Sequence, residues 1–163
     1  MQIPHKFSPW ISWTERTTLA NLRLPGIYIL RLSKTRNIAS QPFDWCPEII
    51  YVGMSNSKAG LKGRLKQFDR TINMKEGHGG ACRVRHKHRD YDALVQSLYV
   101  AVQTFDCDPS ACLPNDFRTM GQVALLEYDC LATFLEKFGR LPEFNDRSSP
   151  KYHPENQPTK IQV

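Results

Sequence analysis

The spacing of apolar residues predicts a long amphipathic helix late in the chain. Over residues 115–138, apolar side chains recur every three or four positions, which is the period of one helix face. Asn115 is a favourable N-cap for this helix, and Gly139 is a favourable residue to end it. At roughly 100° per residue, Glu127 falls at the centre of the apolar stripe. The stripe consists of Met120, Val123, Ala124, Cys130, Leu131, Phe134 and Phe138.

Glu127 is therefore the first candidate for a functional residue. Burying a carboxylate without a partner costs on the order of several kcal/mol, so a folded chain either neutralises it or supplies a cation. The alternative is a residue at the edge of the stripe whose carboxylate reaches water. We favour the buried position, because the apolar stripe continues on both sides of Glu127.

Shorter patterns predict three strands and a further helix. Residues 26–32 and 48–52 are rich in β-branched and aromatic residues, and residues 96–105 alternate in the period of a strand. The spacing over residues 57–70 predicts an amphipathic helix between the second and third strands. Arg64 lies at the edge of the apolar stripe of this helix, where its guanidinium can point along the sheet.

Length and composition are those of one domain from a reducing compartment. With 163 residues the chain is long enough for one core and too short for two domains. Prolines interrupt its start, which lacks a signal-peptide pattern, and no apolar run approaches the roughly 20 residues of a membrane span. The five cysteines form no Cys-x-x-Cys pair, so we expect an intracellular, cytoplasmic protein with reduced cysteines. A zinc site of Cys107 and Cys112 with His86 and His88 is an alternative, although its spacing is unlike that of ordinary structural sites.

Positive charge is concentrated in one window of the chain. Residues 58–89 contain ten Lys and Arg against Asp69 and Glu76, a net charge of +8, whereas the whole chain carries +6. A basic face on a nearly neutral body is typical of a protein that binds a polyanion such as DNA. The alternative is a basic surface that only faces solvent. The expected nucleic-acid contacts are Lys58, Lys62, Lys66, Arg70, Arg83, Arg85 and Lys87.

Five short motifs follow one another along most of the chain. They are Gly-Ile-Tyr at 26–28, Tyr-Val-Gly at 51–53, the helical segment 60–68 with Arg64, the isolated Glu127, and Leu-Pro-Glu-Phe-Asn at 141–145. In this order and on these predicted elements, the motifs resemble those of the GIY-YIG nuclease superfamily. The resemblance covers residues 25–145. Either tripeptide alone would carry no weight, whereas the five together form a specific pattern.

The resemblance implies hydrolysis of phosphodiester bonds with one divalent metal ion. Glu127 would hold Mg²⁺ or Mn²⁺ as the single carboxylate ligand, with water and phosphate oxygens as the other ligands. Arg64 would bind the scissile phosphate and stabilise charge in the transition state. Tyr51, or in second place Tyr28, would orient or deprotonate the attacking water, with ordinary packing in the sheet as the alternative. Asn145 would position the neighbourhood of Glu127 or a water, with a simple turn residue as the alternative.

The chain departs from the family pattern in three respects. The loop between the tripeptides is long, with 22 residues between Tyr28 and Tyr51. Phe68 stands one turn after Arg64, where many relatives carry His or Tyr for a second acid-base role. His78, in a Gly-rich stretch, could fill that role from a flexible loop, with a surface position as the alternative. A second domain that would choose the DNA target is not recognisable.

We expect an α/β fold, in the α+β sense of a small, mainly antiparallel central sheet flanked by helices, as the resemblance implies. Residues 1–24 would form an N-terminal extension with a short helix at 14–21, residues 25–145 the nuclease domain, and residues 146–163 a polar, flexible tail. The expected function is a metal-dependent DNA endonuclease. The alternative is a weak or inactive nucleic-acid-binding module of the same fold, and a purely structural protein fits the basic window poorly. The DNA target, the biological role and the oligomeric state do not follow from the sequence.

Overall fold

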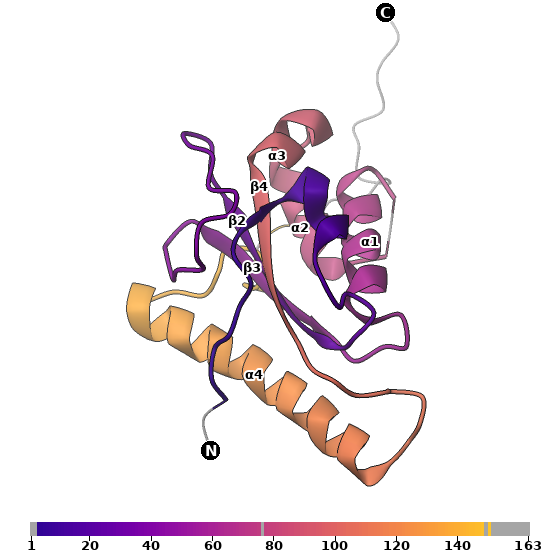
Figure 1. The fold of residues 1–163 in the computed structure, drawn as a ribbon. Coiled ribbons are helices and arrows are strands. Elements are labelled where there is room, and N and C mark those ends of the chain that lie inside the picture. Colours follow the sequence, from indigo (N-terminus) through magenta and orange to yellow (C-terminus); the bar gives the residue numbers. More distant parts are fainter. Residues whose placement is uncertain (1–2, 76, 149, 151–163) are drawn as a thin grey trace, which may run out of the picture.

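The chain folds around a four-stranded antiparallel sheet that is flanked by helices (Figure 1). This computed structural model describes residues 3–75, 77–148 and 150. The strands lie in the order β1-β4-β2-β3, so the expected α+β fold with an antiparallel sheet is confirmed. The strand bounds are Ile11–Ser12 for β1, Gly26–Leu32 for β2, Ile49–Ser55 for β3 and Leu98–Thr104 for β4.

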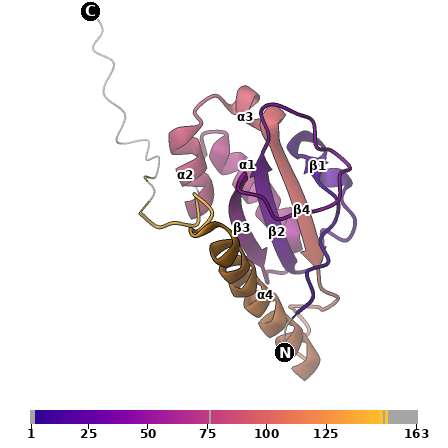
Figure 2. The same cartoon turned by 90° about the vertical axis from the view of Figure 1, so that its left-hand side faces the viewer.

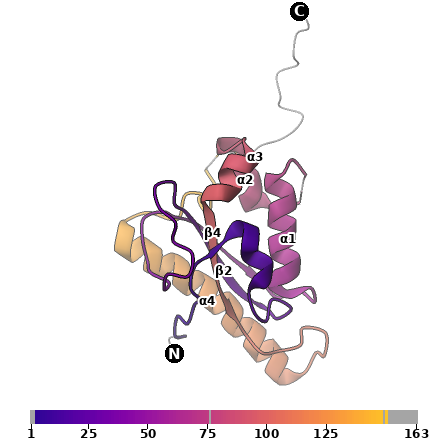
Figure 3. The same ribbon diagram turned by 45° about the horizontal axis from the view of Figure 1, so that its top comes forward.

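Helical segments pack on both sides of this sheet (Figure 3). The short helix expected at 14–21 is a 3-10 helix, and α2 and α3 were not predicted. Each of those two begins at a side-chain cap, where His78 and Asp90 accept hydrogen bonds from backbone N–H groups. Among the described residues, no helix is long and apolar enough to cross a bilayer. The bounds are Trp13–Thr18 for η1, Gly60–Ile72 for α1, Gly79–Lys87 for α2, Tyr91–Ser97 for α3 and Pro114–Phe138 for α4.

The two faces of the sheet carry separate hydrophobic cores. Helices α1, α2 and α3 cover one face, and α4 covers the other (Figure 2). Alternation along β2 divides its residues between the two cores, since Tyr28 and Leu30 face α1 whereas Ile27 and Ile29 face α4. β3 lies at an edge of the sheet and contacts both α1 and α4. Side chains from both layers can therefore meet at this edge.

The N-terminal segment is an integral part of both cores. β1 pairs with β4 in antiparallel register, with Ile11 opposite Val100. Trp10 and Trp13 are fully buried, Trp10 in the core under α4 and Trp13 in the core under α1. The predicted boundary at residue 24 therefore does not separate an extension from the sheet. Most of the tail expected at 146–163 lies outside the described residues.

The start and the inward face of α4 differ from the prediction. The helix begins at Pro114 with Leu113 as N-cap, not with Asn115, because proline is favourable at the first helical position. Gly139 ends it with φ of 68°, as expected. Four side chains of α4 are fully buried, and at 100° per residue Glu127 lies roughly 55° from their mean direction. Glu127 is thus half-buried at the edge of the stripe, and its predicted central position is wrong. The buried residues are Val123, Leu126, Cys130 and Phe134.

One buried arginine fixes the long segment between β2 and β3. Arg31 is 1% exposed and donates hydrogen bonds to Asp44 at 2.9 Å and to Glu48 at 2.6 Å. Its guanidinium also lies over the ring of Trp10. A buried charge is stable only when such partners are all present. Although the segment is long, these contacts hold it in place where it leads into β3.

Candidate active site

Regular pairing of β2 with β3 places Tyr51 on the same face of the sheet as Tyr28. Leu30 lies opposite Tyr51, and Tyr28 lies opposite Gly53 two residues further along β3. Both tyrosines therefore face α1, and their ring centroids are 5.9 Å apart. A bulge at Ile50, where Arg31 lies opposite Ile49, ends this regular pairing and puts Ile50 on the same face. The two tyrosines of the tripeptide motifs thus lie side by side.

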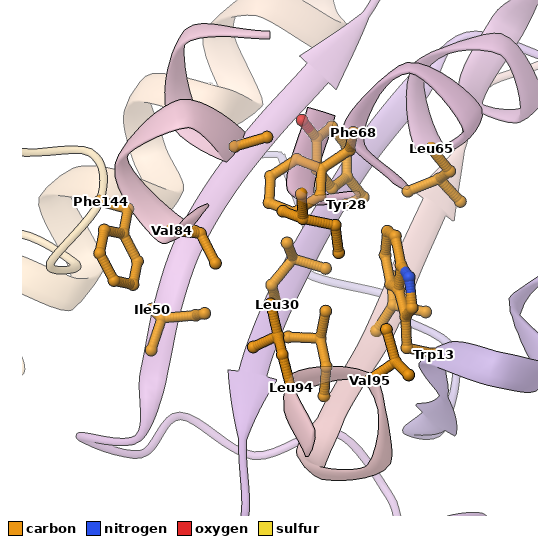
Figure 4. Packing of buried hydrophobic residues seen from close by; sticks show 14 of the residues in the cluster. Trp13, Tyr28, Leu30, Ile50, Leu65, Phe68, Val84, Leu94, Val95 and Phe144 are labelled. Atoms are coloured by element: carbon orange, nitrogen blue, oxygen red, sulfur yellow. The ribbon is translucent and has the colours of Figure 1, made fainter. Parts of the chain in front are cut away.

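Tyr28 is fully buried among apolar and aromatic side chains (Figure 4). Its hydroxyl lies against Gly53 on the neighbouring strand, where a Cβ atom would come within 2.5 Å of the hydroxyl oxygen. Only glycine leaves room for the tyrosine at this position. The glycine of the second tripeptide therefore has a packing reason that is specific to the site.

His78 donates a hydrogen bond to Tyr28 from the start of α2. Its Nδ1 accepts from the N–H of Ala81 at 3.2 Å, so in the neutral ring the proton resides on Nε2. Nε2 lies 2.8 Å from the Tyr28 hydroxyl and donates to it. His78 is 2% exposed, so the alternative of a surface histidine is wrong. Its ring packs on Phe68 with centroids 4.9 Å apart.

The Gly-rich stretch brings His78 close to Tyr51. A Cβ atom on Gly80 would lie 2.4 Å from Cε2 of Tyr51, so a larger residue would push the start of α2 away. The rings of His78 and Tyr51 are 5.7 Å apart. This stretch, which by sequence looked like a flexible loop, is a close packing contact of the site.

Burial keeps the side chains of Tyr28, Tyr51 and His78 neutral around pH 7. It lowers the pKa of His78 to about 3, and the positive charge of Arg64 acts in the same direction. Burial also raises the pKa of Tyr28 well above its usual value of 10.0. The pKa of Tyr51 is raised by burial as well, although Arg64 opposes this shift. Neither phenol is therefore a ready base in the protein alone.

Arg64 supplies the positive charge of the site from α1. Its Nη1 donates to Oε1 of Gln67 at 2.7 Å, and Nε2 of Gln67 donates to the carbonyl of Gly77 at 2.6 Å. Among the described residues, Nε of Arg64 is buried without a hydrogen-bond partner. A cavity of about 450 Å³ opens beside Arg64. Gln67 was not predicted, although its spacing of three residues from Arg64 on a helix places it on the same face.

Glu127 approaches the same place from the opposite layer. α4 packs against β3, and the negative charge of Glu127 raises the pKa of Tyr51. Burial raises the pKa of Glu127 itself, and Arg64 opposes that shift. Within the described part of the chain, this half-buried carboxylate has no hydrogen-bond partner, which fits the binding of one hard cation through oxygen.

A site with several protein ligands does not form in the described part of the chain. No group of three or more His, Cys, Asp or Glu side chains there could hold a metal ion. The alternative zinc site of Cys107 and Cys112 with His86 and His88 is therefore contradicted. Any metal at Glu127 would have one carboxylate from this chain, and water or substrate oxygens would complete its coordination.

Asn145 binds the exposed edge of β3 beside Tyr51. Its Oδ1 accepts from the N–H of Val52 at 2.8 Å, and its Nδ2 donates to the Val52 carbonyl at 2.7 Å. The N–H of Phe144 donates to the Ile50 carbonyl at 3.0 Å. The segment thus pairs with the edge strand in place of a further strand. Asn145 therefore holds the edge of β3 in position beside the site. This role combines features of the two expected alternatives, a residue of the site and a simple turn residue.

The predicted nucleic-acid contacts divide into three groups. At 100° per residue, the exposed Lys62, Lys66 and Arg70 lie on the side of α1 away from Arg64. Lys58 is exposed before α1, Arg83 is half-buried near Tyr51, and Lys87 pairs with Glu143 at 2.5 Å. Arg85 is buried and donates to the Arg89 carbonyl and to the Met74 sulfur, so it is not part of a basic surface as predicted.

Comparisons with protein-family models, curated protein sequences and solved structures find no match to this chain. The resemblance to GIY-YIG nucleases therefore rests on the five motifs.

Proposed function

We propose that this chain is a metal-dependent DNA endonuclease with a GIY-YIG-like site. The observation that carries the proposal is one cluster of side chains from distant parts of the sequence, which shift one another's pKa values at the edge of β3. One arginine, one carboxylate and two tyrosines in such a cluster are suited to hydrolysis of a phosphodiester. The cluster consists of Tyr28, Tyr51, Arg64, His78 and Glu127.

Arg64 binds the scissile phosphate in this proposal. A guanidinium offers several N–H donors in one plane, and its Nε has no partner among the described residues. The contact with Gln67 holds the side chain in place before substrate arrives. A preorganised cation of this kind stabilises the negative charge that develops on the phosphate oxygens in the transition state.

Tyr51 orients the attacking water or a phosphate oxygen. His78 donates to the Tyr28 oxygen, so the Tyr28 O–H is left to donate to another acceptor, and Tyr51 lies beside it. With Tyr28 as the donor, the O–H of Tyr51 is free to donate toward the substrate. His78 completes the chain as a positioning residue.

Glu127 would hold the single Mg²⁺ or Mn²⁺ ion. When bound, such an ion polarises the phosphate and lowers the pKa of a coordinated water. DNA would approach from the side of Arg64, where Lys58 lies between two residues that line the cavity and Arg83 lies near Tyr51.

A second candidate function is a nucleic-acid-binding module without turnover. It is favoured by the protonation states, because both phenols are neutral and Nδ1 of His78 already accepts a hydrogen bond. The residues of the cluster then hold a phosphate but offer no general base of their own.

The deciding experiment is a cleavage assay on supercoiled plasmid with Mg²⁺ or Mn²⁺, using wild type and Glu127→Gln. The variant keeps the size of the side chain but loses the charge that holds the cation, so we expect at least about a 10²-fold loss of nicking with an unchanged fold by circular dichroism. Glu15→Gln, at an exposed position in η1, is the matched control and should cleave as wild type does. Undiminished cleavage by Glu127→Gln would refute the assignment. Wild type that retains DNA in gel shifts but never cleaves it would establish the second function.

A further inference from the structure

Helix α4 has a second apolar face that points away from the sheet. Phe117, Leu125, Tyr128 and Leu135 on this helix are between 47% and 71% exposed. These four side chains belong to neither core of the described residues, and the N-terminal segment contacts the flank of α4, where His5 hydrogen-bonds Asp129. Single exposed apolar residues are common, but a row that follows the whole length of a helix indicates a partner.

The spacing of this outer row is that of a coiled coil. Its members follow one another at intervals of four, three, four, three and four residues, which is a heptad pattern. At 100° per residue, the centre of the row lies roughly 130° around the helix from the side chains buried against the sheet. α4 therefore has one face for its own sheet and one for another helix. The row consists of Phe117, Gly121, Ala124, Tyr128, Leu131 and Leu135.

Gly121 is an independent indication of a helix partner. It lies inside α4, where glycine costs about 1 kcal/mol relative to alanine. A Cβ atom there would meet nothing within 4 Å, so the packing of the described chain gives no reason for a glycine. Close approach of a second helix supplies that reason, because it needs a position without a side chain.

We propose that the outer row packs against the same row of a second copy of this chain, with the two α4 helices antiparallel. Such an alignment places Phe117 opposite Leu135, Gly121 opposite Leu131 and Ala124 opposite Tyr128. The two inner pairs each combine a small residue with a large one, which lets the side chains interdigitate. The arrangement is isologous, so one two-fold axis satisfies both copies.

Charge selects the antiparallel direction. Arg118 and Glu136 are five helical turns apart and lie on the same flank of the outer row. In the antiparallel pair, Arg118 of each copy lies near Glu136 of the other, so two ion pairs form. A parallel pair would leave Arg118 and Glu136 about five turns apart along the axis, so these ion pairs would not form. On this flank Asp129 pairs with His5 and Glu136 is exposed, and the two carboxylates also make it a poor surface for DNA.

The first test measures self-association of the full chain by sedimentation between about 1 and about 100 μM. We expect wild type to show a monomer–dimer equilibrium in this range. Gly121→Arg places a long charged side chain in the contact and should weaken association at least about 30-fold. Gln122→Arg puts the same side chain one residue along, outside the row, and should associate as wild type does. A wild type that remains monomeric, or a Gly121→Arg variant that still dimerises, overturns the proposal.

Charge reversal tests the direction of pairing. Arg118→Glu and Glu136→Arg should each weaken the dimer, because each creates two like-charge contacts. The double variant restores opposite charges across the pair and should return to within a few-fold of wild type. If the double variant stays weak, the antiparallel alignment is wrong. These measurements need no DNA or metal, so they stand apart from the cleavage assay.

Discussion

The two faces of the sheet are equally well buried but differ in chemistry. Tyr28 and Ile29 are neighbours on β2, and both are fully buried, one on each face. The face under α4 is mostly apolar, and the hydrogen bonds of its Trp10 and Tyr99 go to the exposed residues Asp44 and Asn37. The face under α1 includes the polar groups of Tyr28, Tyr51 and His78, which satisfy one another. One strand thus contributes to a dry core and to a candidate site at the same time.

In this molecule, the side chains that mainly stabilise the fold and those that form the candidate site lie largely on different faces of the sheet. On the α4 face the loss of an apolar side chain of α4, such as Phe134, removes packing, whereas on the α1 face a substitution also disturbs an ordered set of polar groups. Glu127 joins the two, because it comes from the helix of the dry face and acts on Tyr51 across the edge of β3. Variants on each face can therefore show where this separation fails.

The largest effect is expected for loss of packing on the face of the sheet under α4. Phe134→Ala should lower the free energy of unfolding by about 3–5 kcal/mol, because it leaves a large cavity under α4. Cleavage measured well below the melting temperature should stay within a few-fold of wild type. Phe68→Ala, which also removes a ring that packs on Tyr28, Tyr51 and His78, should lower stability and cleavage together. Equal loss of cleavage in both variants would show that the faces are coupled.

The next largest effect is expected for Arg64→Ala. It should raise the activation free energy of cleavage and leave the stability of the fold nearly unchanged. Single-turnover cleavage should fall about 10²-fold or more, the scale for one preorganised charge, while the melting temperature changes little. Arg64→Lys should recover little, because an ammonium cannot offer the same fork of donors. DNA affinity in Ca²⁺ should fall by no more than a few-fold. Lys75→Ala, which removes one exposed charge after α1, is the control; parallel losses of rate and affinity would make Arg64 an ordinary phosphate contact.

The smallest effect is a change in the pH dependence of stability. The pKa of His78 is about 3 in the folded protein against about 6.5 when unfolded, so between these values the unfolded chain binds the extra proton. Stability is therefore lost as the pH falls from 6.5, by at most about 1.4 kcal/mol per pH unit from this group. His78→Gln should be less stable at pH 7 but show a flatter curve between pH 6 and 4 in denaturant melts. Parallel curves for the two proteins would mean that His78 is not buried and neutral.

Regular patterns in the sequence predicted the scaffold well. β2 has the predicted bounds because its residues alternate cleanly between two apolar faces, and Gly139 ends α4 as expected. The position of Glu127 was wrong for a physical reason. Ala124 and Leu131 were counted in the inward stripe, although they also belong to the outer row. Two apolar faces on one helix moved the apparent centre of the stripe toward Glu127.

The candidate site was predictable in its residue types and not in its assembly. Tyr28, Tyr51, Arg64 and Glu127 were named from the motifs; the rings of the two tyrosines lie 5.9 Å apart, and the charges of Arg64 and Glu127 both affect the pKa of Tyr51. The register that puts both tyrosines on one face depends on pairing between strands, which local patterns do not encode. The burial of His78 depends on how α2 packs against Tyr51, so a lone histidine between glycines gave no signal for it.

The contact of Asn145 with Val52 has a consequence for the order of folding. The two residues are 93 positions apart, so the edge of β3 cannot close until almost the whole described chain has left the ribosome. Glu127 also comes late in the chain. During synthesis, Tyr51 and Arg64 exist long before the residues that complete their surroundings. A nascent chain therefore carries no assembled site, and the cluster forms only when the last segment docks.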